Sequence, residues 1–313
     1  MGNRQIGEYV KILSIDGGGI RGILAITVLK NIEKQYKCKI ADLFDVLAGT
    51  STGAIIAAAA AIGKEMEDIY DSYYKHGEKI FERNAKVGFF KSIYTNHHLR
   101  NYLQDAYGEI LLSEVKKPLL LPAVDINKGK PYVHRSHVRS EGEKKESVKL
   151  WDAVLSSCSA PVYFPPNEMQ NKHLAIDGGL WANNPSLVTI TEALSFFHQN
   201  LEDIQVLSIG TGLQSISFQD QEGREWGAQS WLPFQFPSMR ITPKLLDLAL
   251  HISSEAISYH CRHLLHDHYL RLNAELQKEM PFDDVTFLQE LTVMGEKLYE
   301  EQKKDIEHFF EKV

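Results

Sequence analysis

The stretch LFDVLAGTSTGAI (residues 43–55) decides the fold of this chain. LFDVLAG is largely apolar and predicts a strand, and the small and apolar residues after Ser51 predict a helix. Gly49 and Gly53 flank Ser51 in the pattern Gly-x-Ser-x-Gly, which is typical of a nucleophile elbow, a sharp turn that holds its serine in a strained backbone conformation. Glycines there let neighbouring chain approach without a clash at Cβ. Alone, the pattern is short and also fits a serine that caps a helix.

The same alternation of strand, turn and helix precedes this stretch. Residues 9–15 predict a buried strand, DGGGIRG (16–22) breaks it, and residues 21–36 have helical periodicity. This order indicates an α/β fold with a mostly parallel central sheet flanked by helices. Because the carboxyl ends of parallel strands meet at one edge, both glycine-rich turns should lie at the edge where such folds place their sites.

The remaining sequence continues this alternation and then changes character. Further strands are expected at 118–126 and 131–138, joined as a hairpin, and at 173–177 and 205–212, with helices within 65–110 and at 147–159 and 185–200. Residues 213–243 carry clustered tryptophans and phenylalanines without a period, which predicts either a lid or a packed surface loop. Residues 244–313 are expected to be mainly helical. We expect one domain over residues 1–313, with its motif core at 9–213.

The composition argues against several classes of protein. The chain has 313 residues and a net charge of −7, whereas nucleic-acid binders are usually basic. Three cysteines without a CxxC pair suggest neither a zinc site nor a disulfide framework, and we expect no metal or cofactor. The N-terminus lacks the apolar segment of a signal peptide, and the longest apolar run, 54–62, is far shorter than a bilayer span. We therefore expect a cytoplasmic protein with peripheral membrane association.

The turn DGGGIRG has two interpretations. Gly17-x-Gly19-x-x-Gly22 matches a dinucleotide-binding fingerprint, which needs an acidic residue at the end of the second strand. That strand ends in AGTST instead, so we favour a cradle of backbone N–H groups that binds an anion at the start of a helix. Beside a nucleophile, such a cradle is an oxyanion hole. Arg21 either adds positive charge there or braces the loop by a salt bridge.

A nucleophilic serine needs a group that accepts its proton. None of the 13 histidines lies in a strand-end loop beside a glycine. Asp177 does, because it ends the apolar segment HLAID and precedes Gly178 and Gly179. The reference pKa of an aspartate is low, so this base would need a partly desolvated pocket. An aspartate that only forms a turn before glycines is the alternative.

Four motifs in order resemble one family. They are IDGGGIRG, GTSTG, SAPVYFPP (159–166) and the DGG that begins at Asp177, and together they resemble patatin-like phospholipases over roughly residues 9–213. The resemblance implies a patatin-like three-layer fold and metal-free hydrolysis of acyl esters in phospholipids or other lipids at a membrane surface.

The resemblance also implies roles for single residues. Ser51 would be the nucleophile and Asp177 the base, in a dyad without histidine. The oxyanion loop would comprise Gly17, Gly18 and Gly19, with Arg21 beside it.

KILSIDGGGIRGI and KHGEKIF (75–81) are similar to bacterial patatin-like lipases. Some of these are antiphage effectors that a cyclic nucleotide switches on, so a cyclic dinucleotide is a candidate activator. A homo-oligomer is left open. Two other interpretations also stay open: a nucleotide-binding regulatory module that uses the DGGGIRG loop, and a catalytically silent scaffold.

Overall fold

The computed structural model describes residues 9–82, 92–137, 147–169, 173–196, 198–214, 234–235, 240–241 and 244–311. The candidate lid at 213–243 lies largely outside these described residues. Within it, only three two-residue strands are described: β8 (Leu213–Gln214), β9 (Phe234–Gln235) and β10 (Arg240–Ile241). The lid prediction therefore stays a prediction.

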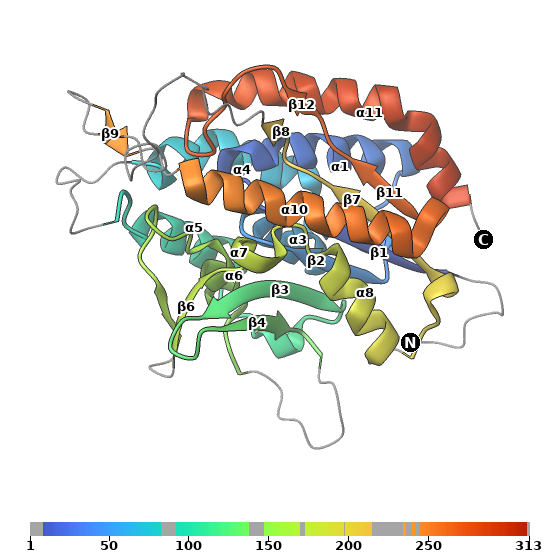
Figure 1. Ribbon diagram of the computed structural model, residues 1–313, viewed down its shortest axis with the longest axis horizontal. Helices are drawn as coiled ribbons and strands as arrows, with labels where there is room; N and C mark the ends of the chain where they lie inside the picture. The colour runs from blue at the N-terminus through green and yellow to red at the C-terminus, as the bar shows by residue number, and fades with distance from the viewer. Residues whose placement is uncertain are drawn as a thin grey trace, which may run out of the picture.

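An eight-stranded sheet runs through the molecule (Figure 1). Its order is β11 (Tyr269–Leu272), β7 (Ile204–Ile209), β1 (Val10–Ile15), β2 (Val46–Gly49), β3 (Leu119–Asp125), β6 (His173–Asp177) and β5 (Asn167–Met169), and β4 (Lys130–Arg135) also pairs with β3. The strands from β11 to β3 are parallel, whereas the pairings β3–β4, β3–β6 and β6–β5 are antiparallel. The mostly parallel sheet and the hairpin are thus confirmed.

The central strands are mostly apolar and almost entirely buried because helices cover both faces of the sheet. Every residue of β7 is buried, as are all but one in β1, which is typical of parallel strands. One prediction was wrong here. The strand expected from residue 43 begins only at Val46, since Ile40–Leu43 forms the short helix α2. The C-terminal part is mainly helical, as expected, and it also contributes β11 to the edge of the sheet.

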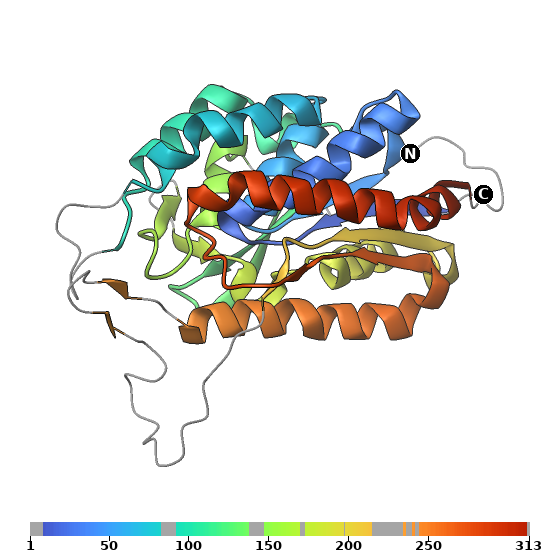
Figure 2. The ribbon, with the colours of Figure 1, turned by 90° about the horizontal axis from the view of Figure 1, so that it is seen from above.

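Helices form a layer on each face of the sheet (Figure 2). One layer holds α1 (Gly22–Tyr36), α3 (Thr52–Ala61), α4 (Met66–Ile80), α5 (His97–Tyr107), α6 (Leu150–Cys158) and α11 (Leu288–Glu311). The other holds α7 (Gly179–Ala182), α8 (Ser186–Ser195) and α10 (Lys244–Leu265). Each layer packs on its own apolar core, so the three-layer α/β architecture is confirmed.

Short elements complete the described chain. They are the 3₁₀ turns η1 (Gly19–Arg21), η2 (Leu112–Glu114), η3 (Leu201–Asp203), η4 (His266–His268) and η5 (Val285–Phe287), and the strand β12 (Glu275–Leu276). The helix expected at 185–200 is shorter than predicted, because α8 begins directly after Pro185 and ends at Ser195. In the part of the chain that the structure describes, no helix combines the length and apolarity that crossing a membrane requires.

Candidate active site

Ser51 lies at the sharp turn between β2 and α3. Its backbone has φ 55° and ψ −121°, a combination that side-chain-bearing residues rarely adopt. Only glycine fits at the two positions that flank Ser51 in the motif, because other backbone atoms lie too close to them for a side chain. A Cβ on Gly49 would stand 1.9 Å from the carbonyl oxygen of Gly53, and one on Gly53 would stand 2.2 Å from that of Ile15. The backbone therefore has the elbow conformation that the sequence predicts.

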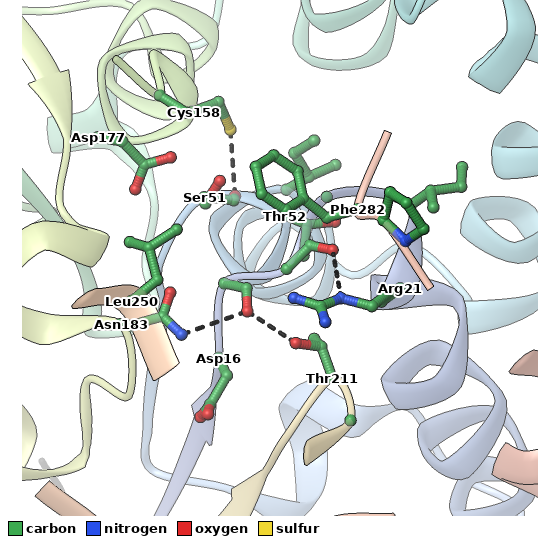
Figure 3. A pocket seen from close by; sticks show the side chains of 18 of the residues that line it. Asp16, Arg21, Ser51, Thr52, Cys158, Asp177, Asn183, Thr211, Leu250 and Phe282 are labelled. Atoms are coloured by element: carbon green, nitrogen blue, oxygen red, sulfur yellow. Dashed lines mark hydrogen bonds between the residues drawn. The ribbon is translucent and has the colours of Figure 1, made fainter. Parts of the chain in front are cut away.

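Asp177 approaches this turn from a strand that runs in the opposite direction. It ends β6, where it pairs with Ala123 of the antiparallel strand β3, and its carboxylate lies beside Ser51 (Figure 3). The side chain is buried, and its Oδ1 accepts a hydrogen bond of 2.8 Å from the Gly179 N–H. Burial raises the pKa of Asp177 to about 6, although hydrogen bonds from Gly179 and from the Ser51 side chain lower it. The partly desolvated environment that an aspartate base at this position would need is therefore present.

The glycine loop at residues 17–19, which was predicted to bind an oxyanion, differs in one respect from the prediction. The Gly17 N–H donates to the Asn183 carbonyl at 3.0 Å, so it is not free to bind an oxyanion. Among the described residues, by contrast, the N–H groups of Gly18 and Gly19 donate to no partner. Gly19 has φ +56°, and a Cβ there would stand 2.2 Å from the Phe282 carbonyl oxygen, so only glycine fits. The three predicted donors are thus reduced to Gly18 and Gly19, whose role stays a prediction.

The carbonyl groups of the same loop anchor it to the protein. The Gly17 carbonyl accepts hydrogen bonds from Thr211 Oγ1 at 2.7 Å and from Asn183 Nδ2 at 3.5 Å (Figure 3). Arg21 donates from Nε to the Gly18 carbonyl at 3.5 Å and from Nη1 to Gln214 at 3.1 Å. Of the two roles considered for Arg21, these contacts favour bracing the loop. They use neutral oxygens, however, instead of the expected salt bridge.

A buried ion pair holds Asp16, the residue directly before the glycine loop, and none of the sequence motifs indicated this pair. Arg271 of β11 donates to both carboxylate oxygens of Asp16, at 2.7 Å and 2.6 Å, and Ser254 of α10 donates to the same carboxylate. Burial raises the pKa of Asp16, which the guanidinium of Arg271 counteracts. The one available signal was an arginine inside the apolar segment YLRL, a residue type that is almost never buried without a partner.

Most of these groups line one open cleft in the described part of the chain, and the empty space within it, counted together with the part open to solvent, is about 1280 Å³. Ser51, Asp177 and the glycine loop form part of its wall, and apolar side chains of α3, α4 and α5 form another part, among them Ile55, Ile80 and Leu99. A buried carboxylate, a serine hydroxyl on a strained turn, and two backbone N–H groups that have no partner in the described part of the chain lie beside an apolar space, and such groups can together carry out acyl transfer. Nowhere in the described ranges do histidine, cysteine or acidic residues cluster as they would around a metal ion.

The sequence of the chain is similar to those of several known proteins. The model of the family described as patatin-like phospholipase matches residues 13–190. Patatin-like protein 4 of Arabidopsis thaliana is 30% identical over 342 aligned positions, which cover 94% of this chain and 84% of that protein. A cGAMP-activated phospholipase of Escherichia coli (strain TW11681) is 32% identical, over 64% of this chain and 62% of that protein. One of Vibrio cholerae serotype O1 is 31% identical, over 65% and 64%.

Proposed function

This chain belongs to the patatin-like phospholipase family, and on that premise we propose that it cleaves acyl ester bonds of membrane phospholipids with Ser51 as nucleophile and Asp177 as base. The observation that supports this most strongly is the buried Asp177 carboxylate beside the Ser51 elbow, with its pKa raised to about 6. At neutral pH such a carboxylate is ionised, yet it is a stronger base than an exposed aspartate.

The first half of the reaction forms an acyl-enzyme. Asp177 accepts the Ser51 proton as the hydroxyl oxygen attacks the ester carbonyl carbon. The oxyanion of the tetrahedral intermediate is stabilised by the N–H groups of Gly18 and Gly19, and a well-placed donor of this kind contributes about 3–4 kcal/mol. When the intermediate collapses, the leaving alcohol of the lysolipid takes the proton from Asp177.

The second half returns the enzyme to its starting state. Water attacks the acyl-enzyme while Asp177 accepts its proton, and the fatty acid leaves as Ser51 is reprotonated. The apolar wall around Ile55, Ile80 and Leu99 suits an acyl chain, which buries methylene groups favourably.

Regulation by a cyclic dinucleotide is part of the proposal. Two of the relatives described above are named cGAMP-activated phospholipases. We infer that this chain likewise attacks membranes as a peripheral enzyme in antiphage defence, after a cyclic dinucleotide activates it.

The test uses mixed phospholipid vesicles, with and without a panel of cyclic dinucleotides, and mass spectrometry of the released fatty acid. Wild-type protein should release fatty acid, whereas Ser51→Ala and Asp177→Asn should not. Release that survives Asp177→Asn refutes this residue as the base. If folded wild-type protein releases nothing in any arm but binds one nucleotide stoichiometrically, the regulatory-module interpretation replaces the hydrolase proposal.

A further inference from the structure

Three consecutive residues at the C-terminal end of α6 contact both members of the proposed dyad. Ser157 Oγ accepts a hydrogen bond of 3.0 Å from the Ser51 N–H, and Cys158 Sγ donates to the Ser51 carbonyl at 3.1 Å (Figure 3). The carbonyl of Ser159 accepts a hydrogen bond of 3.0 Å from the Asp177 N–H. One helix end thus holds the backbone of the nucleophile on both sides and the backbone of the base.

The side chain of Ser157 is oriented differently from those of neighbouring serines. Ser156 and Ser159 donate back to helix carbonyls four residues earlier, at 2.9 Å and 2.8 Å, as serines in helices commonly do. Ser157 instead donates to the Pro122 carbonyl of β3 at 2.6 Å, which leaves its oxygen lone pairs for the Ser51 N–H. The hydroxyl is therefore fixed between the central sheet and the elbow.

The end of α6 also explains how the base is held. The last carbonyls of a helix have no partner within it, so the Ser159 carbonyl is available to the Asp177 N–H. Strained conformations such as that of Ser51 persist only when their surroundings over-determine them. The bond of 2.8 Å from the Ala54 N–H holds the Ser51 carbonyl from within α3, but the Ser51 N–H is held by Ser157 alone among the described residues.

We propose that Ser157, Cys158 and Ser159 form a positioning clamp that keeps the Ser51 hydroxyl in line with the Asp177 carboxylate. The clamp rests on the proposed function, because it acts through the dyad. Its residues are buried and take no part in proton transfer or nucleophilic attack. Loosening the clamp should slow the chemical step and leave substrate binding intact.

The experiment compares Ser157→Ala, Cys158→Ala and Cys158→Ser, with Ser156→Ala as the matched control on the same helix. The readouts are kcat and KM for a soluble short-chain ester, the rate at which an alkyl fluorophosphonate labels Ser51, and the melting temperature. Ser157→Ala should lower kcat and the labelling rate about 10- to 100-fold with KM unchanged, because a small misplacement of a reacting group has effects of this size. Cys158→Ala should lower both less, and Cys158→Ser should recover them because a hydroxyl also donates.

Ser156→Ala removes bonds to the Asp152 carbonyl and to Asn167, so it should lower the melting temperature without lowering kcat. If Ser51→Ala abolishes activity but Ser157→Ala keeps the wild-type kcat, the clamp is refuted while the proposed function stands. Activity that survives Ser51→Ala refutes the proposed function itself. Should Ser157→Ala fail to fold, equal labelling rates for wild type, Cys158→Ala and Cys158→Ser refute the clamp.

Discussion

Replacing Asp177 by asparagine should abolish catalysis and at the same time stabilise the fold at neutral pH. Burial raises the pKa of this carboxyl group from its ordinary value of 3.8 to about 6. At neutral pH the folded protein therefore holds an ionised carboxylate in a buried environment that disfavours its charge. Asparagine has nearly the same shape, keeps an oxygen that can accept from the Gly179 N–H, and carries no charge.

The size of the stabilisation follows from the shift. A difference of about two pKa units corresponds to about 3 kcal/mol. Because the pKa of Asp177 is higher in the folded state, ionisation of this group lowers the free energy of unfolding of wild type, and the loss reaches its full size above about pH 6. The penalty disappears below pH 3.8, where the carboxyl group is neutral in both states. The variant should therefore be up to about 3 kcal/mol more stable at pH 8, with the gain falling towards zero at pH 4.

Urea unfolding of wild type and Asp177→Asn at pH 8, 6 and 4 measures this difference. The exposed aspartate Asp71 of α4 supplies the control, and Asp71→Asn should change stability little at any of these values. An Asp177→Asn gain that is absent at pH 8, or equally large at pH 4, would refute the view that a buried carboxylate is held there at the expense of stability.

Three further predictions concern the same site. The kcat/KM for a soluble ester should rise about tenfold per pH unit up to about pH 6 and then level off, since only ionised Asp177 accepts a proton; a profile that is flat from pH 5 to 8 contradicts this. Gly19→Ala should lower kcat at least about 100-fold, because the new Cβ would meet the Phe282 carbonyl and displace the glycine loop. Steady-state kinetics of the folded variant will measure this loss of kcat. Arg271→Met should destabilise the protein by about 3–5 kcal/mol in urea unfolding, because it leaves Asp16 buried without its cation; the double change with Asp16→Asn should be much milder, and equal losses would argue against the pair.

Much of the site could be predicted because its signals are local. The elbow needs only a strand, a helix and the glycines on either side of Ser51, all within a dozen residues. Asp177 stood out because two glycines follow an apolar strand, and its burial agrees with the pocket that a carboxylate base requires. The alternation of strands and helices likewise indicated the layered fold before any contact was known.

The features that could not be predicted depend on contacts between residues that lie far apart in the sequence. Three glycines in a row look equivalent, yet the Gly17 N–H donates to the Asn183 carbonyl, whereas those of Gly18 and Gly19 donate to no residue within the described ranges. The strand β11 has only four residues and directly follows the turn η4, and its pairing with β7 has no local signature. Similarly, a serine and a cysteine at the end of α6 look like ordinary core residues until Ser51 packs against them.

The pair of Asp16 and Arg271 bears on when the enzyme becomes active during its synthesis. It joins positions 255 residues apart, and a ribosome extends the chain from its N-terminus at about 5–20 residues per second. The four family motifs emerge first, but the carboxylate beneath the oxyanion loop meets its guanidinium only after β11 has been translated. We expect a nascent chain to carry the proposed nucleophile and base before the loop between them is supported, so hydrolysis should begin only once β11 has paired with β7.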